Sequence, residues 1–219
     1  MIVSNDLIAL HGYAFVPRLL PHLLLPALVD VIGTLATMES GSAYSTLEPM
    51  PEQHASPVSY SGMYGMGEFP FHTDLAHWRQ PPRFLLLRCV TGFREVPTLL
   101  VDGHQLIERI GPGRLSRALV RPRRPRDGSI PLLRLYQRSD ADSLLRWDSK
   151  FIAPSGRAGT EAYNEMQVAI AETTPIHIEL QEPADTLIVD NWRMLHARGG
   201  IPEHCKGRRV ERAYLGKIT

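Results

Sequence analysis

The sequence predicts a mainly β protein with flanking helices, arranged as a β-sandwich or jelly roll. Three observations predict it: many short apolar runs bounded by turn residues, helical periodicity before the first run, and one helical stretch that interrupts them. A length of 219 residues suits one domain of ordinary size, which we expect to span residues 1–219. The sequence contains no internal repeat and no interdomain linker.

Residues 1–45 are expected to form a helical part of this domain. After Pro21, apolar residues recur at steps of three and four as far as Leu35, which is one face of a helix. Prolines and glycines over residues 46–70 predict an irregular segment, typical of lids and binding loops. The jelly-roll core is then expected over residues 46–219.

The later apolar runs are each predicted to be a strand: 83–90, 99–101, 130–136, 144–152, 176–180, 186–189 and 209–218. Turn pairs such as Asp102-Gly103 separate them. Two helices are expected among the strands, a short one over 104–110 and an inserted one at about 160–173, where apolar residues share one face.

Composition and charge exclude several classes of protein. Hydrophobic residues at 43% and charged residues at 21% argue against disorder, collagen and a coiled coil. A net charge of +1 predicts neither a nucleic acid nor an acidic membrane as partner. Cys89 and Cys205 form no C-x-x-C pair, which suits a reducing compartment. The N-terminus lacks a secretory pattern and the apolar residues 19–38 include Asp30, so we expect a cytoplasmic protein without a membrane span.

The first motif with chemical meaning is His72-Thr73-Asp74. In a strand, residues i and i+2 share a face, so His72 and Asp74 would present an imidazole and a carboxylate to the same side. His196, at the end of a later apolar strand, offers a third ligand. Two histidines and one carboxylate leave coordination positions open, as in non-haem Fe(II) oxygenases. The alternative for the tripeptide alone is a surface histidine beside a turn aspartate.

Further blocks in a fixed order make the pattern specific: a glycine-rich segment at 65–67, the pair Pro81-Pro82, Thr98, the run 190–198 and the basic run 208–212. Together, over residues 56–216, these blocks resemble the taurine catabolism dioxygenase family, the clavaminate-synthase-like branch of Fe(II)/2-oxoglutarate-dependent oxygenases. The resemblance implies a double-stranded β-helix, which is a distorted jelly roll with flanking helices.

The resemblance also implies a metal centre and a reaction. His72, Asp74 and His196 would hold Fe(II), with 2-oxoglutarate as cosubstrate and O₂ as oxidant. The implied reaction releases succinate and CO₂ and hydroxylates or desaturates a small molecule.

Two basic residues and one hydroxyl complete the implied cosubstrate site. Arg208 would pair with the distal carboxylate of 2-oxoglutarate, which a planar guanidinium meets through two hydrogen bonds, and Thr98 would support it. Arg212 corresponds to a second family arginine that contacts an anionic group of the cosubstrate or substrate. If this run is a strand, alternation places Arg208, Val210 and Arg212 on one face and Arg209 on the other.

Several neighbouring side chains are candidates for substrate contact: Tyr60, Tyr64, His77, Trp78 and Arg198. For His77 and Trp78, a role in packing is as good an interpretation as substrate contact. The arginines near the motif favour a substrate with a carboxylate, sulfonate or phosphate, such as an amino acid or a specialised-metabolite intermediate.

Three further features have expected roles, the first with two interpretations. Arg146 and Asp148 form either a charged pair at the pocket mouth or, as we prefer, an ordinary cross-strand ion pair. Asp190 is a candidate hydrogen-bond partner of a ligand histidine, whereas Asn191 and Trp192 are expected to position the strand before His196.

The arginine-rich segment 114–126 is predicted to be a solvated or subunit-facing loop, partly disordered. Two other functions stay open: a metal-dependent jelly-roll enzyme that does not use 2-oxoglutarate, and a non-catalytic module that binds nucleic acid through this loop. The expected partner is a small-molecule substrate, not a nucleic acid, and a homo-oligomer is compatible with the sequence.

Overall fold

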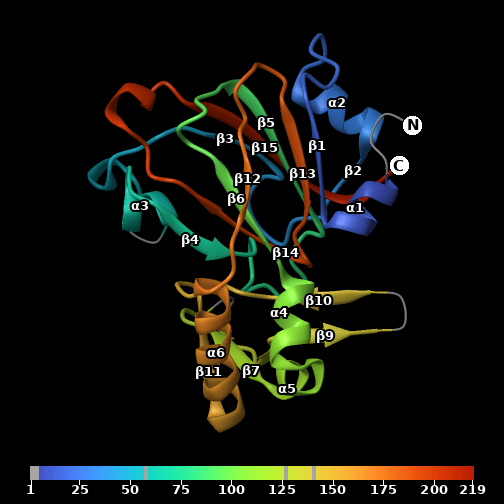
Figure 1. The fold of residues 1–219 in the computed structure, drawn as a ribbon, viewed down its shortest axis with the longest axis vertical. Helices are drawn as coiled ribbons and strands as arrows, with labels where there is room; N and C mark the ends of the chain where they lie inside the picture. The colour runs from blue at the N-terminus through green and yellow to red at the C-terminus, as the bar shows by residue number, and fades with distance from the viewer. Residues whose placement is uncertain (1–4, 57–58, 126–127, 140–141) are drawn as a thin grey trace.

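A computed structural model describes residues 5–56, 59–125, 128–139 and 142–219. Two antiparallel sheets form its upper part in Figure 1. The larger sheet runs in the order β1 (Tyr13–Val16), β13 (Thr186–Asp190), β5 (Phe84–Thr91), β15 (Arg209–Ile218) and β2 (Gly33–Leu35), and β3 (Tyr44–Leu47) also pairs with β15. The smaller sheet runs β12 (Ile176–Ile178), β6 (Thr98–Asp102), β14 (Met194–Arg198) and β4 (Phe69–His72).

The space between the two sheets is filled by alternate residues of their strands. Leu85 and Leu87 of β5 face the smaller sheet, whereas Leu86 between them faces the opposite side, as a period of two requires. Leu100 of β6 and Met194 of β14 close this inner layer from the other sheet. The arrangement confirms the predicted mainly β, jelly-roll class.

The outer face of each sheet is covered differently. Against the larger sheet pack α1 (Asn5–His11) and α2 (Leu25–Ile32), through buried side chains such as Ile8 and Leu28. The smaller sheet sends Val101 and Leu195 into a lobe that lies below the sheets in Figure 1.

That lobe contains three helices and two small sheets: α4 (Gly103–Ile110), α5 (Pro112–Arg117), α6 (Gly156–Ala171), the sheet of β11 (Ile152–Ser155), β7 (Leu119–Pro122) and β8 (Leu133–Arg134), and the pair β10 (Ser143–Leu145) and β9 (Tyr136–Arg138). The helix expected at about 160–173 is α6, which begins four residues earlier.

The expectation of a purely helical N-terminal part is wrong. Periodicity correctly predicted α2, but β1 and β2 also lie in this part, β3 begins at its end, and all three belong to the larger sheet. Gly12 has a φ of +81°, a conformation that favours glycine, and lets the chain turn directly from α1 into β1. The partner strand of β1 is β13, more than 170 residues away, so no local pattern predicts the pairing.

Other predicted segments differ in detail. The single strand expected over 144–152 is two strands, β10 and β11, and the run 130–136 contains β8 and the start of β9. Residues 46–70 are not wholly irregular, because they include β3, the 3₁₀ turn η1 (Glu52–His54) and α3 (Tyr60–Tyr64).

The arginine-rich segment is also more ordered than expected. Its residues form α5 and β7, and Arg114 makes an ion pair with Glu165 of α6. Arg126 lies outside the described residues. Of the helices in the described part of the chain, none has the length and apolar character needed to cross a membrane.

Candidate metal centre

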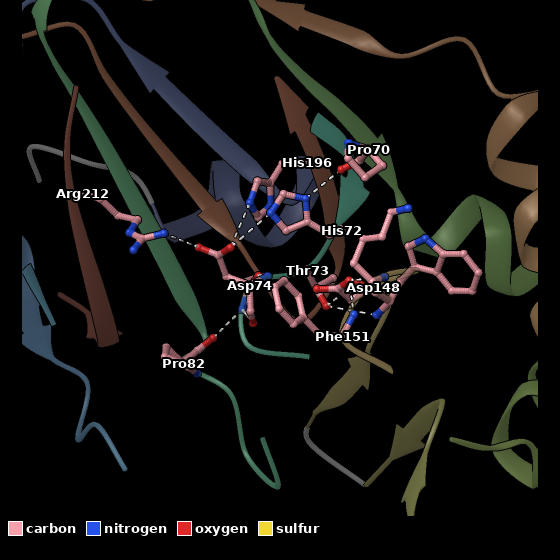
Figure 2. A network of polar contacts seen from close by, with 12 residues as sticks. Pro70, His72, Thr73, Asp74, Pro82, Asp148, Phe151, His196 and Arg212 are labelled. Atoms are coloured by element: carbon pink, nitrogen blue, oxygen red, sulfur yellow. Dashed lines mark hydrogen bonds and ion pairs between the residues drawn. The ribbon is translucent and has the colours of Figure 1, made fainter. Parts of the chain in front are cut away.

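Two neighbouring strands bring the predicted ligands together. β4 and β14 are antiparallel, and His72 lies directly opposite His196. Asp74 follows β4 by two residues, and its Oδ1 lies 3.3 Å from His72 Nε2 and 3.5 Å from His196 Nε2. Figure 2 shows all three side chains converging on one point between the sheets. All three are buried, with 6 to 8% of their surface exposed.

The hydrogen bonds of the histidines leave the facing nitrogens available. His72 Nδ1 donates to the carbonyl of Pro70 at 2.8 Å, which leaves the lone pair on Nε2. His196 Nδ1 is buried and has no hydrogen-bond partner among the described residues. Two imidazole nitrogens and a carboxylate oxygen within 4.8 Å of one another fit a divalent first-row metal ion such as iron.

The charges at the centre favour a bound cation. Burial alone would raise the pKa of Asp74, but hydrogen bonding to His196 and His72 and the charge of Arg212 hold it well below its usual value. Burial and the neighbouring His72 lower the pKa of His196. Burial also lowers the pKa of His72, but its contacts with Asp74 raise it overall. The buried Asp74 carboxylate therefore remains an anion beside the two imidazoles and Arg212.

Distant residues fix Asp74. Asn191, which is fully buried, accepts from the Asp74 backbone nitrogen at 2.7 Å and donates to its carbonyl at 3.0 Å. The same amide donates to the carbonyl of Pro82 at 2.9 Å, and Figure 2 shows Pro82 below Asp74. On the other side, Asp74 Oδ2 accepts from Tyr214 at 2.7 Å and from Arg212 at 3.4 Å.

The predicted cosubstrate residues line the same cavity. Arg208, 7% exposed, lies immediately before β15, and Thr98, 5% exposed, begins β6. Among the described residues the Nε of Arg208 has no hydrogen-bond partner, and burial lowers the pKa of its guanidinium. Arg209 instead lies at the surface, 3.2 Å from Glu48. Alternation thus places Arg208 and Arg212 on the cavity side, as the sequence predicted.

Arg198 has a different environment from the one expected. Its guanidinium lies 3.6 Å from the centre of the Phe69 ring and donates to carbonyls of the glycine-rich segment, including Gly65 at 3.1 Å. Burial and the charge of Arg208 lower its pKa to about 10. Although Arg198 borders the cavity, its guanidinium thus donates its hydrogen bonds to the backbone between α3 and β4.

The cavity has a volume of about 870 Å³ and reaches from the metal centre to the lobe below the sheets. Tyr60 of α3 stacks on the His72 ring with 4.3 Å between ring centres. His77 and Trp78 also line the cavity. Tyr64 does not; its ring packs on Tyr60 at 6.0 Å, one layer further from the metal centre.

Asp148, for which the sequence favoured an ordinary ion pair with Arg146, lines the cavity. A β-bridge pairs it with His72, and Oδ1 accepts from the backbone nitrogens of Lys150 and Phe151 at 2.8 and 2.9 Å. Burial raises the pKa of Asp148, and the nearby His72 only partly offsets this. The buried Tyr60 hydroxyl lies near this carboxylate, which together with burial raises the pKa of Tyr60. No sequence pattern links Asp148 to His72, because 76 residues separate them.

Two of the roles predicted for charged residues are wrong. Arg146 is fully buried and pairs with no carboxylate among the described residues; it donates to the carbonyls of Ala76 and Trp78 at 2.9 and 2.7 Å, and to three further oxygen atoms. Burial lowers its pKa to about 10. Asp190 binds the backbone nitrogen of Trp192 and lies 3.7 Å from Arg83, so neither ligand histidine is its partner.

The fold and the site define a class: a jelly-roll protein with two histidines and one carboxylate on its inner face. No protein-family model matches the chain. The chain is similar to clavaminate synthase 2 of Streptomyces clavuligerus, with 26% identity over 193 residues, which cover 81% of this chain and 58% of that protein. The resemblance to clavaminate-synthase-like oxygenases, predicted from the ordered motifs, is thereby confirmed.

Solved structures share the fold. Asparagine oxygenase in complex with Fe(II), 3-hydroxyasparagine and succinate superposes with a TM-score of 0.65 at 20% identity, over 84% of this chain and 60% of that chain. The oxygenase OrfP in complex with Fe and alpha-ketoglutaric acid gives a TM-score of 0.67 at 18% identity, over 97% of this chain and 77% of that chain. The chain therefore spans less than two thirds of clavaminate synthase 2 and of asparagine oxygenase.

Proposed function

We propose that this chain is an Fe(II)/2-oxoglutarate-dependent oxygenase that acts on a small, amino-acid-derived molecule. The observation that carries the proposal is the convergence of His72, Asp74 and His196 in one cavity with Arg208, a buried arginine whose Nε is without a partner in the described chain. Bound by such a triad, Fe(II) supplies the redox chemistry that couples decarboxylation of 2-oxoglutarate to oxidation of a substrate, with succinate and CO₂ as co-products.

The cosubstrate would be held by this chain's own side chains. Arg208 offers a desolvated guanidinium to the distal carboxylate, and a charge-assisted pair is strongest where water is excluded. Thr98, which begins β6 in the opposite sheet, adds a hydroxyl donor to the same cavity. Arg209, the adjacent arginine, faces solvent and would take no part.

A buried carboxylate in the cavity favours a substrate that carries a positively charged group. Asp148 presents a buried carboxylate there, and the rings of Tyr60 and Phe151 line the same cavity. A buried carboxylate is stabilised by an ammonium or guanidinium partner. The amino acids bound in the structures of two structural neighbours, hydroxyasparagine and hydroxyarginine, both carry such a group. Because Arg198 and Arg146 bond to backbone carbonyls, they no longer support a substrate chosen for its negative charge.

An anaerobic titration tests the cosubstrate assignment. 2-Oxoglutarate is added to the Fe(II) protein while the visible charge-transfer band is recorded. We expect Arg208→Ala to weaken 2-oxoglutarate binding by at least about tenfold, the effect of losing one charge-assisted hydrogen bond. The matched control Arg209→Ala, which removes a similar but exposed charge, should bind as the wild type does. Equal binding by both variants would reject the role of Arg208.

Two further outcomes separate the alternative functions. An Fe(II) protein that binds 2-oxoglutarate in no variant and forms no succinate would be a metal-dependent jelly-roll enzyme of another kind. Duplex binding that weakens with salt and survives His72→Ala would indicate a nucleic-acid-binding module instead.

A further inference from the structure

We infer that Tyr214 is a positioning residue that, together with Arg212, keeps Asp74 a ligand through a single oxygen, Oδ1. The inference rests on the proposed metal centre and adds to it a residue that the ordered motifs did not contain. Tyr214 lies on β15, 140 residues from Asp74 in sequence, and is 4% exposed.

The two oxygens of Asp74 have separate environments. Oδ1 faces both imidazole Nε2 atoms, at 3.3 and 3.5 Å. Oδ2 faces β15, where the hydroxyl of Tyr214 donates to it at 2.7 Å and Nη1 of Arg212 lies 3.4 Å away. The carboxylate is therefore oriented with one oxygen toward the metal centre and the other bonded within the protein.

The tyrosine makes the stronger of the two contacts. Its hydroxyl–carboxylate distance is that of a strong hydrogen bond to a charged acceptor, whereas the arginine contact is near the limit for a hydrogen bond. Arg212 also donates from Nε to Ser45 at 3.0 Å and lies over the Tyr214 ring at 4.8 Å. The Arg212 guanidinium thus contacts both the Tyr214 ring and the Asp74 carboxylate.

This orientation matters because a carboxylate can bind a metal through one or both oxygens. A second bond from Oδ2 would occupy a coordination position that the facial triad leaves for other ligands. Partners of metal ligands outside the coordination sphere commonly change metal affinity by about 10- to 100-fold when they are removed. By holding Oδ2, Tyr214 would preserve both the affinity and the open positions.

Cobalt(II) titration of the metal-free full-length chain tests this inference without any turnover. Dissociation constants and the visible ligand-field spectrum are compared for the wild type, Tyr214→Phe and the control Tyr136→Phe, whose buried ring lies in the lower lobe. We expect Tyr214→Phe to bind cobalt about tenfold more weakly or worse, with an altered spectrum that reports a changed ligand set. Tyr136→Phe should match the wild type in both.

Further variants keep the test decisive. Arg212→Met leaves the hydrogen bond from Tyr214 to Asp74 intact, so this variant should lose less cobalt affinity than Tyr214→Phe. If Tyr214→Phe does not fold, Arg212→Met is measured in its place. A wild-type affinity and spectrum in Tyr214→Phe, or in Arg212→Met as its replacement, would overturn the inference while leaving the metal centre in place. Failure of the wild type to bind cobalt, or binding unchanged in His72→Ala, would instead refute the proposed metal centre itself.

Discussion

Asn191 bonds both backbone polar groups of Asp74, accepting from its nitrogen at 2.7 Å and donating to its carbonyl at 3.0 Å, across 117 residues of sequence. Asp74 lies beyond the end of β4, so no strand pairing holds its backbone at this point. The side chain of Asn191 takes the place of a strand partner and fixes the position from which the carboxylate reaches the histidines.

The first prediction follows from this contact. Asn191→Ala should lower the free energy of unfolding by about 3 kcal/mol, because it leaves several buried backbone groups without partners. Urea denaturation measures the loss, and cobalt affinity should fall with it. The matched control is Asn164→Ala on the exposed side of α6, which we expect to change stability by less than about 0.5 kcal/mol. A similar decrease in the free energy of unfolding in both variants would show that the contact between Asn191 and Asp74 contributes little to stability.

Arg146 gives the second prediction. All five of its N–H groups are used, and its side chain joins the segment after Asp74 to the lower lobe. Arg146→Met should destabilise the protein by at least about 3 kcal/mol, because buried carbonyls lose a charged donor. Arg157→Met removes an exposed arginine that is paired with Glu161 and should leave the unfolding temperature close to that of the wild type. Thermal unfolding of both variants provides the comparison.

The third prediction concerns the glycine-rich segment. Because Arg198 donates to the carbonyls of Gly65 and Gly67, Arg198→Met should loosen the backbone between α3 and β4. Hydrogen exchange of the amides over residues 59–67 should quicken by about tenfold, as expected for a loss of about 1.4 kcal/mol of local stability. Cobalt binding should remain near the wild-type value, since no metal ligand is lost. Unchanged exchange together with weakened anion binding would instead support the original substrate role of Arg198.

The fourth prediction is a pH dependence of stability. Burial alone would raise the pKa of Asp102, but its hydrogen bonds with Arg193 and with the His104 backbone nitrogen lower it below its ordinary value of 3.8. The stabilising contribution of the Asp102 anion is therefore complete above pH 3.8 and is lost as the pH falls through the lower, folded-state pKa.

Asp102→Asn provides the test of that dependence. At pH 7 the substitution should cost about 2 kcal/mol, because Arg193 loses a charged acceptor at 2.6 Å. Near pH 2 the difference from the wild type should shrink, since the native carboxyl group is then increasingly protonated. Urea denaturation at both pH values measures the difference in free energy of unfolding between the variant and the wild type. A difference of the same size at pH 7 and near pH 2 would contradict the lowered pKa of Asp102.

Local sequence patterns were sufficient for the elements with strong periodicity. Short apolar runs bounded by turn residues predicted β5, β6, β13 and β15, the helical period predicted α2 and α6, and the closing glycines and proline indicated α4. Alternation along an extended run separated Arg208 from Arg209, and extended by one step it would also have indicated Tyr214, two residues beyond Arg212. A period of two is a property of the extended backbone itself, so it can be read without knowing the partner strand.

Residue identity and order therefore indicated the proposed metal ligands and the face on which the proposed cosubstrate arginine lies. Tertiary structure alone decided which groups the remaining charged side chains meet. Arg198 was expected near substrate and Arg146 in a cross-strand ion pair, yet both bind backbone carbonyls, and Asp148 lines the cavity next to His72, with which it forms a β-bridge. The physical reason is that a buried charge must find its hydrogen-bond partners wherever the folded chain supplies them, and those partners come from segments far away in sequence.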